Sequence, residues 1–327
     1  MTRVLFVHNL ESSFIEIDRR LLEQRFDVED WYQPRPIANP LAILRAVARC
    51  DVVVGWWAHW HTFLPITFAW LLRKPSLLIV GGFDIASIPE IGYGHQRGGV
   101  RKWISRWTMH RARRLATNSY YSQGEVERNV GISADRVAVM HHGLPDPFGE
   151  LPAKPSPPVA LTVGIVDRVN LERKGHRPFV EAAARLPGFS FVLAGRSIDD
   201  AADELRARST DNVELTGWIE DDELLQRYRQ AAVYVQASQH EGFGMSVAEA
   251  MLAGAIPVVT AVGALPEVVG DLGVQVRDAD PDRLAAAIAA AAEMGPEAAA
   301  AARERILREF SLEQRGRSIC ALVDGLL

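Results

Sequence analysis

Two glutamates eight positions apart flank a glycine-rich turn in the stretch HEGFGMSVAEAMLAG. Gly242 and Gly244 allow the backbone to approach a ligand closely, and Ser246 followed three residues later by Glu249 is typical of a helix start. The free N–H groups of a helix start favour phosphate. Glu241 and Glu249 add hydrogen-bond acceptors for the hydroxyls of a ribose and a sugar. The pattern therefore points to a sugar nucleotide as the ligand.

The segments on either side of this turn indicate where it lies. Residues 231–236 and 256–259 have the composition of strands. A strand, a glycine turn and a helix in this order place the turn at a strand's carboxyl end, where open α/β sheets bind ligands. Taken alone, Ser246 and Glu249 would be an ordinary capping box and Glu241 a solvated loop acid.

Short β-branched runs alternate with amphipathic segments along almost the whole chain, which predicts parallel sheets covered by helices. Between the two halves, residues 142–158 contain six prolines in seventeen positions and are predicted to be a linker. Two lobes joined by a linker create a cleft in which small ligands bind. The expected strands are residues 4–7, 28–32, 51–54, 76–80, 114–117 and 136–140 in the first half, and 160–163, 190–193, 212–215, 233–236, 256–259 and 274–276 in the second.

The composition is that of a globular protein with two domains: 327 residues, 48% apolar and 24% charged. Residues 1–155 hold 19 Lys and Arg against 15 Asp and Glu, whereas the remainder holds 17 against 26. Only two cysteines occur, Cys50 and Cys320, which favours a reducing compartment. The longest apolar run, residues 63–72, is too short to span a bilayer and contains Pro65. We therefore expect a cytoplasmic protein.

Several enzyme classes lack their motifs in this sequence. The first expected strand is followed by HNLESS and not by the G-x-G-x-x-G of nicotinamide enzymes. The motifs G-x-x-x-x-G-K-[ST], G-x-S-x-G and H-E-x-x-H are also absent, which disfavours P-loop kinases, serine hydrolases and zincins. Nucleic acid is not an expected partner.

The segment from Glu241 to Glu249, followed by AMLAGAIPVV, resembles the E-x7-E signature of retaining glycosyltransferases of the GT-B fold, family 4. Similar motifs are GALPEVVG at 263–270, VG at 163–164 leading to RKG at 173–175, LAG at 193–195 and LTGW at 215–218. Residues 81–84, 116–119 and 137–143 match the family more loosely. The resemblance covers nearly the whole chain, but its specific motifs lie in the second half.

The resemblance implies an α/β protein with two Rossmann-like parallel-sheet domains facing across a cleft. Residues 1–150 would form the acceptor domain, with the C-terminal helix 311–327 packing back on it, and residues 158–310 the donor domain. In the family the first carboxylate of the signature, here Glu241, contacts the transferred sugar, and the second, here Glu249, binds the ribose. The family's phosphate-binding lysine falls on Lys174. The backbone that cradles sugar and diphosphate corresponds to Gly242, Phe243, Gly244, Met245 and Ser246.

Two further donor contacts follow from the resemblance. Gly164 begins the phosphate loop, but Ile165 stands where the family has arginine, so the second phosphate cation is displaced. Arg168 is our candidate for it and Arg173 the alternative. The nucleotide base is expected near Gly217, Trp218 and Ile219, although Trp218 equally fits a packing aromatic.

The expected acceptor residues depart from the family pattern. Ser13 stands where a glycine-rich turn is usual, and Asp84 replaces a frequent histidine. Asp84 either orients an acceptor hydroxyl or caps a helix. Tyr93 and His95 are further candidates for the acceptor side, together with His59, Trp60 and His61.

A basic segment with tryptophans follows these residues. No acidic residue occurs from 91 to 124, while cations and tryptophans alternate over 97–114. Such a helix fits an anionic membrane surface or a phosphorylated acceptor. The alternative is a solvated helix whose tryptophans pack inward. If the helix binds a membrane, the protein would lie at the inner face.

The predicted function is transfer of a glycosyl group from a nucleotide diphosphate sugar to a hydroxyl of a glycan, lipid or small molecule, with retention. No cofactor and no metal are expected, because Lys174, Arg168 and the helix at Ser246 would stabilise the departing diphosphate. The alternatives are a sugar-nucleotide-binding protein without turnover and a phosphorylase-like or epimerase enzyme on the same architecture. The sequence does not identify the donor or the acceptor.

Overall fold

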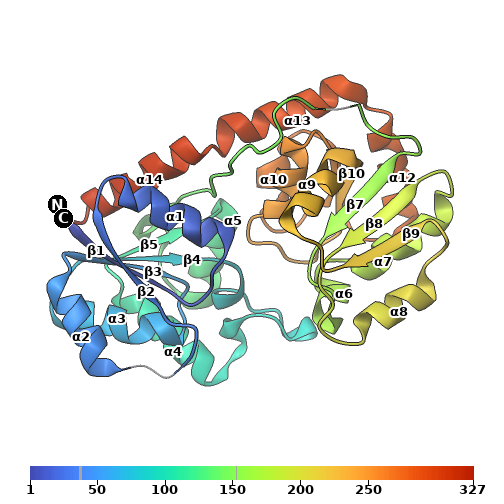
Figure 1. The fold of residues 1–327 in the computed structure, drawn as a ribbon. Coiled ribbons are helices and arrows are strands. Elements are labelled where there is room, and N and C mark those ends of the chain that lie inside the picture. The colour runs from blue at the N-terminus through green and yellow to red at the C-terminus, as the bar shows by residue number, and fades with distance from the viewer. Residues whose placement is uncertain (37–38, 152) are drawn as a thin grey trace. The chain divides into compact units, whose positions relative to one another are not determined.

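The computed structural model describes residues 1–36, 39–151 and 153–327, which form two compact units (Figure 1). Unit 1 comprises Met1–Gly143 and Ser311–Leu327, and unit 2 comprises Leu144–Phe310. Each unit contains one six-stranded sheet. All strand pairs within the two sheets are parallel, as expected for alternating strands and helices.

The sheet of unit 1 has the strand order β2-β1-β3-β4-β5-β6. Its strands are β1 (Arg3–His8), β2 (Asp27–Tyr32), β3 (Val52–Trp56), β4 (Ser76–Val80), β5 (Arg114–Thr117) and β6 (Val137–Val139). Its helices are α1 (Ser13–Glu23), α2 (Pro40–Arg49), α3 (Trp60–Leu71), α4 (Gly99–Arg111), α5 (Tyr120–Glu125) and α14 (Leu312–Asp324).

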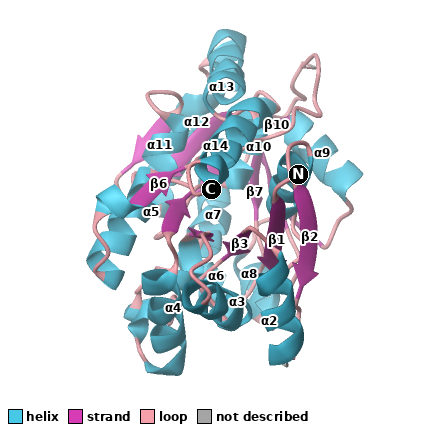
Figure 2. Ribbon diagram, turned by 90° about the vertical axis from the view of Figure 1, so that its left-hand side faces the viewer, coloured by secondary structure: helices cyan, strands magenta, loops and turns pink. Residues whose placement is uncertain are grey.

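Alternate residues of the unit 1 strands enter two separate cores, because successive side chains of a strand point to opposite faces. On one face, Leu5 and Val7 pack with residues of α2, α3 and α4, which lie together in Figures 1 and 2. On the other face, Val4 and Phe6 pack with residues of α1 and α14. Both faces of the sheet are therefore buried.

Helix α14 is joined to α1 by a buried ion pair. The Arg315 guanidinium contacts both carboxylate oxygens of Asp18, at 2.7 and 2.6 Å, and each side chain is only 1% exposed. The same carboxylate accepts a hydrogen bond from Trp56 Nε1 at 3.0 Å. The last residues of the chain thus belong to the core of unit 1, although unit 2 precedes them in sequence.

The sheet of unit 2 has the strand order β12-β11-β10-β7-β8-β9. Its strands are β7 (Val159–Val163), β8 (Ser190–Ala194), β9 (Val213–Gly217), β10 (Ala231–Gln236), β11 (Ile256–Thr260) and β12 (Val274–Val276). Its helices are α6 (Arg168–Arg173), α7 (His176–Ala182), α8 (Ala201–Arg208), α9 (Asp221–Gln230), α10 (Met245–Leu252), α11 (Leu265–Val269), α12 (Pro281–Ala292) and α13 (Gly295–Glu309).

Each sheet has one point where the strand order reverses. In unit 1 it lies between β1 and β3, and in unit 2 between β7 and β10. The loops that leave two such strands diverge at their carboxyl ends, and open α/β sheets bind ligands in that position. The topology therefore favours the loops after β7 and β10 as the site in unit 2.

All twelve predicted strands are present, with ends within two residues of the expected ones. The described part of the predicted linker, residues 142–151 and 153–158, contains no helix and no strand longer than a single bridged residue, whereas Pro152 lies outside the described residues. Leu144 and Phe148 in this segment are buried in the core of unit 2. Among the described residues, no helix has the length and apolar character needed to cross a membrane.

Candidate functional site

The two loops at the switch point of unit 2 bring together a lysine and a glutamate. Lys174 follows α6 after β7, and Glu241 lies on the loop after β10. Lys174 Nζ lies 3.6 Å from Glu241 Oε2, and the two side chains are 18% and 17% exposed. The sequence motifs RKG and HEGFG, almost seventy residues apart, thus meet at one point.

The charges of this pair are strongly influenced by burial. Burial lowers the pKa of Lys174, and Arg173 lowers it further, although Glu241 opposes both effects. Burial also disfavours the Glu241 carboxylate, but Lys174, Arg173 and His240 together hold the pKa of Glu241 below its ordinary value. An ion pair alone would raise the pKa of its lysine, so desolvation dominates at Lys174. A bound anion would offset that desolvation.

Two glycines allow the close contacts around Lys174. A Cβ atom at Gly164 would lie 2.8 Å from Lys174 Cδ and 3.2 Å from the His176 ring. Gly175 has a φ of +69°, and a Cβ there would lie 2.1 Å from the carbonyl oxygen of Ala237, at the end of β10. Gly164 therefore supports the lysine stem, and Gly175 lets the lysine loop touch the glutamate loop.

The loop after β11 fixes the backbone of Glu241. The Ala264 N–H donates to the Glu241 carbonyl at 2.9 Å. A Cβ at Gly263, whose φ is +61°, would lie 2.3 Å from that same carbonyl oxygen. The GALPEVVG motif thus begins with a glycine that permits the contact, which the sequence reasoning left without a structural role.

The predicted capping box at Ser246 is wrong. Helix α10 begins at Met245, its N-cap is Gly244 with a φ of 107°, and no side chain caps it. Glu249 instead accepts a hydrogen bond from Tyr228 Oη at 2.8 Å. Glycine satisfies no N–H group with a side chain, so the first turn of α10 keeps donors for an anion.

Tyr228 and Tyr234 are site residues that the sequence reasoning missed. Both phenols are buried: Tyr228 Oη donates to Glu249, and Tyr234 Oη donates to Gln236 Oε1 at 3.1 Å. Burial raises the pKa of Glu249, and the Tyr228 hydrogen bond and Lys174 oppose this rise. Tyr228 lies on α9 and Tyr234 on β10. The sequence shows an acid-rich helix and an apolar strand there, but it does not indicate that either tyrosine belongs to the site.

Phe243 is a core residue and Met245 packs partly against the core, which is compatible with the predicted donor contact through the backbone of residues 242–246. Phe243 is buried and meets Phe310 edge to face, with 5.3 Å between ring centroids. Met245 is partly buried against the same cluster.

Arg168 lies in a different environment from Lys174 and Glu241. Its guanidinium pairs with Asp200 on the surface, and the side chain is 60% exposed. Arg173, the alternative second cation, donates to the carbonyl of His240 at 3.5 Å, and its charge acts on both members of the pair. The geometry therefore favours Arg173 over Arg168.

The residues predicted to meet the base follow β9. Gly217 has a φ of +70° with open space at the Cβ position, and Trp218 is 66% exposed. Ile219 packs against the unit 2 core. Trp218 is thus no packing aromatic, and its ring is accessible at the carboxyl edge of the sheet.

In unit 1, Asp84 does not fit the predicted contact with an acceptor hydroxyl. It is buried, and its two carboxylate oxygens accept hydrogen bonds from the N–H groups of Ala58, at 2.8 Å, and Gly81, at 2.9 Å. Burial raises the pKa of Asp84 to about 7, and these hydrogen bonds oppose the rise. Asp84 therefore joins the loops after β3 and β4, close to the predicted role as a cap.

The other predicted acceptor residues lie at the carboxyl ends of the unit 1 strands. Ser13 is the exposed first residue of α1, after β1. Tyr93 and His95 both pack against Phe83, with ring centroids 5.0 and 4.7 Å away. His61 binds the Trp56 carbonyl at 2.7 Å and is buried, so it is a structural residue.

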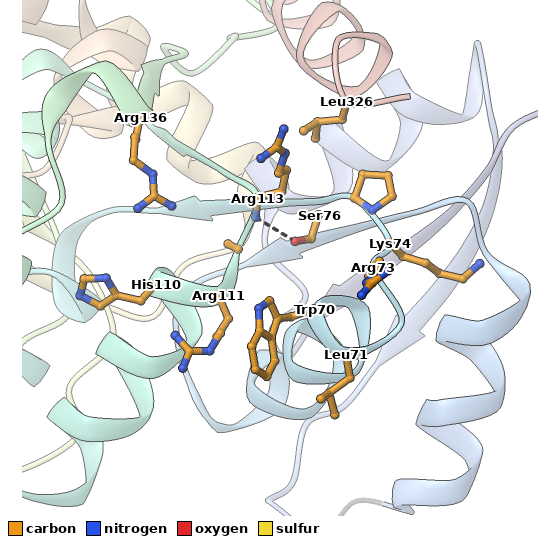
Figure 3. A pocket seen from close by; sticks show the side chains of 12 residues that line it. Trp70, Leu71, Arg73, Lys74, Ser76, His110, Arg111, Arg113, Arg136 and Leu326 are labelled. Atoms are coloured by element: carbon orange, nitrogen blue, oxygen red, sulfur yellow. Dashed lines mark hydrogen bonds between the residues drawn. The ribbon is translucent and has the colours of Figure 1, made fainter.

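The cations of segment 97–114 are divided between the two ends of α4. Arg97 and Arg101 lie near its start, whereas His110, Arg111 and Arg113 line a pocket of 720 Å³ at its end (Figure 3). Arg73, Lys74 and Arg136 line the same pocket, and no acidic residue does so in the described part of the chain. Arg111 lies 4.6 Å from the Trp70 ring and 4.2 Å from Trp107.

Comparisons with known proteins find similar glycosyltransferases. Residues 157–294 match the family described as glycosyl transferases group 1. The chain is 28% identical over 297 residues to a glycogen synthase of Mycobacterium tuberculosis, covering 82% of this chain and 70% of that protein. It is 29% identical over 203 residues to the O-antigen chain mannosyltransferase B of Escherichia coli, covering 55% and 52%.

The fold of this chain also matches the folds of solved protein structures. Anabaena Alr3699/HepE, in complex with UDP and glucose, matches with a TM-score of 0.77 at 18% identity, over 99% of this chain and all of that one. The predicted fold class, two Rossmann-like parallel sheets of the GT-B type, is thereby confirmed. The fold, the family match and the relatives together support a glycosyltransferase of the GT-B fold.

Proposed function

We propose that this protein transfers a glycosyl group from a nucleoside diphosphate sugar to an acceptor hydroxyl, with retention of the anomeric configuration. The observation that carries the proposal is the contact of Lys174 with Glu241 beside the uncapped start of α10. These groups lie at the β7–β10 switch point and supply one cation, one carboxylate and several N–H donors. A diphosphate sugar needs all three kinds of group.

The diphosphate would lie between Lys174 and the first turn of α10. Burial already lowers the pKa of Lys174, so a bound diphosphate stabilises the protonated amine and gains a strong charge-assisted hydrogen bond. As the bond from sugar to diphosphate breaks, negative charge grows on the leaving oxygen, and Lys174 and the helix start stabilise it. Arg173 supplies the second positive charge. Because these groups neutralise the leaving group, we propose that the reaction needs no metal.

The two glutamates would have separate tasks. Glu241 keeps its second carboxylate oxygen for a hydroxyl of the transferred sugar. Glu249, held by Tyr228, offers its remaining lone pairs to the ribose hydroxyls. The exposed ring of Trp218 suits stacking on the base. Neither glutamate acts as a glycosidase acid or nucleophile in this proposal.

The test is a transfer reaction followed by nuclear magnetic resonance. Candidate donors are incubated with acceptors, and the coupling constant of the new anomeric proton is compared with that of the donor. The expected product keeps the donor's configuration, and Lys174→Met loses about 10²–10³ in kcat. Arg168→Gln, which removes a surface cation of the same unit, should stay close to wild type. An inverted product would contradict the proposal.

Two further readouts separate the alternatives. Nucleotide binding without turnover for any acceptor would indicate a sugar-nucleotide-binding protein. Turnover that consumes inorganic phosphate, or donor isomerisation without an acceptor, would indicate a phosphorylase-like or epimerase enzyme. Activity that disappears in chelator and returns with a divalent cation would contradict the proposed metal independence.

We also propose peripheral contact with an anionic membrane through the pocket at the end of α4. Trp70 and Leu71 line this pocket together with its cations (Figure 3), and both side chains are exposed, as is that of Leu72, the next residue. Cations beside exposed apolar side chains suit an anionic lipid surface. Sedimentation with phosphatidylglycerol vesicles should capture the protein at low salt and release it at high salt, and Arg73→Gln with Arg113→Gln should weaken capture. Salt-independent capture, or none, would contradict the contact. The cytoplasmic location stays a prediction.

A further inference from the structure

A second, smaller basic pocket lies at the opposite end of α4. It measures 270 Å³ and is lined by Phe83, Gly94, His95, Arg97, Gly98 and Arg101. Phe83 follows β4, so the pocket opens at the carboxyl edge of the unit 1 sheet. This edge is where an α/β sheet presents its ligand loops.

His95 is the unusual residue of this pocket. It is only 3% exposed, and neither of its ring nitrogens has a hydrogen-bond partner among the described residues. Its ring lies 4.6 Å from that of His59, whose Nδ1 also has no partner in the described chain. Buried polar atoms are nearly always satisfied, so two unsatisfied nitrogens on a residue that lines a pocket indicate a missing partner.

The charges around His95 point to an anion. Arg97 Nε donates a hydrogen bond to the Gly94 carbonyl at 3.0 Å, and Arg101 is exposed. No acidic side chain lines the pocket in the described ranges. Burial, then the charges of His59, Arg101 and Arg97, lower the pKa of His95 to about 4, so its ring is neutral and has one N–H to donate. The neighbouring carboxylate of Asp84 is occupied by two backbone N–H groups.

The loop that carries His95 is held rigidly. Gly94 has a φ of +98°, and a Cβ there would lie 2.0 Å from the Ala86 carbonyl oxygen. The next residue, Gln96, donates from its backbone to that carbonyl at 3.0 Å, and its side chain donates to the Asp84 carbonyl at 2.8 Å. The orientation of His95 is therefore set by the fold before a ligand arrives.

We infer that this pocket binds the phosphate group of a phosphorylated acceptor. A phosphate oxygen accepts the His95 N–H, and the Arg97 and Arg101 guanidinium groups bind the remaining oxygens. The inference rests on the proposed function, because it treats unit 1 as the acceptor-binding unit. It adds the class of acceptor: a sugar or lipid whose hydroxyl is presented by an anchored phosphate.

The test observes the histidine Cε1–H resonances of the full-length protein by nuclear magnetic resonance. His95 is assigned by its loss in His95→Gln, and His176 reports on the donor site because it lies beside Lys174 and Gly164. Inorganic phosphate should shift the His95 signal saturably, whereas chloride at equal ionic strength should not. Arg101→Gln should raise the dissociation constant for phosphate about tenfold. Lys102→Gln, which removes the adjacent cation outside the pocket, should not change it.

Two ligands distinguish the source of the phosphate. Glucose 6-phosphate represents a soluble acceptor, and farnesyl diphosphate in detergent represents a lipid-linked one. A shift of His95 by either, at lower concentration than by inorganic phosphate and weakened by Arg101→Gln, supports the inference and identifies the source. No saturable shift with any of the three, or shifts of equal size in Arg101→Gln, would overturn it and leave an ordered water as the partner.

Failure of this inference can be distinguished from failure of the proposed function. A nucleoside diphosphate should shift His176 and leave His95 in place. If His176 responds to the nucleotide while His95 ignores phosphate, only the acceptor subsite is wrong. If His176 ignores every nucleotide while His95 binds phosphate, the pocket stands and the donor site does not.

Discussion

Removal of the charge of Asp18 should destabilise unit 1 strongly. Asp18 and Arg315 are both 1% exposed and share two hydrogen bonds of 2.6 and 2.7 Å. In Asp18→Asn the guanidinium stays buried beside neutral acceptors only, the amide oxygen of Asn and the carbonyl groups of Met140 and His141. Trp56 Nε1 also loses its charged acceptor. The cost follows from a buried cation that has lost its counter-charge.

The size of this effect follows from the burial. Removing one partner of a buried ion pair costs about 3–5 kcal/mol. For a unit of this size, 1 kcal/mol changes Tm by about 3 °C, so we expect Asp18→Asn to lower Tm by about 10 °C. The loss would be concentrated in unit 1, which alone contains the pair.

A matched control lies on α14, the helix that carries Arg315. Asp324 pairs with Arg25 at 2.8 Å, but these side chains are 37% and 59% exposed. Asp324→Asn should therefore cost at most about 1 kcal/mol. Both variants are compared with wild type by urea unfolding, followed by circular dichroism and tryptophan fluorescence. Equal midpoints for the two variants would refute the argument that burial makes the Asp18 pair more important than a surface pair.

Three other changes test separate parts of the structure. Gly175→Ala should lower the free energy of unfolding in urea by roughly 2 kcal/mol more than Gly217→Ala does. The two glycines have similar φ values, +69° and +70°, but only a Cβ at Gly175 meets a backbone oxygen, that of Ala237 at 2.1 Å. Equal losses in the two variants would contradict this steric argument. Asp84, with its pKa raised by burial to about 7, contributes stability that is complete below about pH 4 and lost as the pH rises through about 7. Between pH 5 and pH 8 wild type should therefore lose roughly 2 kcal/mol more than Asp84→Asn, and parallel pH profiles would refute this. Phe243→Ala should cost about 3–5 kcal/mol in calorimetric unfolding, and a cost under about 1 kcal/mol would show that this ring is not part of the core.

The strands could be predicted from the sequence because they are buried on both faces. A strand in such a sheet is a short, mostly apolar run, as in residues 76–80, whose ends were predicted correctly, as were those of residues 114–117. The order of the strands could not be read in this way. It decides which loops meet, and only the structure shows that Lys174 reaches Glu241.

The errors came from residues whose role depends on tertiary contacts. Ser246 and Glu249 have the spacing of a capping box, but Gly244 is the N-cap and the Glu249 carboxylate accepts a hydrogen bond from the buried phenol of Tyr228. Arg168 was chosen for its place in a loop, and nothing in the sequence indicated that Asp200, the residue before α8, would pair with it. For Asp84 the sequence left an acceptor contact and a cap open, and its two backbone hydrogen bonds favour the cap.

Direct calorimetric titration of nucleoside diphosphates tests the central claim, that Lys174 and the start of α10 hold the donor's diphosphate. UDP, GDP, ADP and TDP are titrated into wild type, Lys174→Met and Arg168→Gln without metal. We predict that at least one nucleotide binds wild type and Arg168→Gln with similar affinity and binds Lys174→Met about 10- to 100-fold more weakly. Binding of that nucleotide to Lys174→Met with the wild-type dissociation constant, or no binding of any of the four to wild type, would contradict the account.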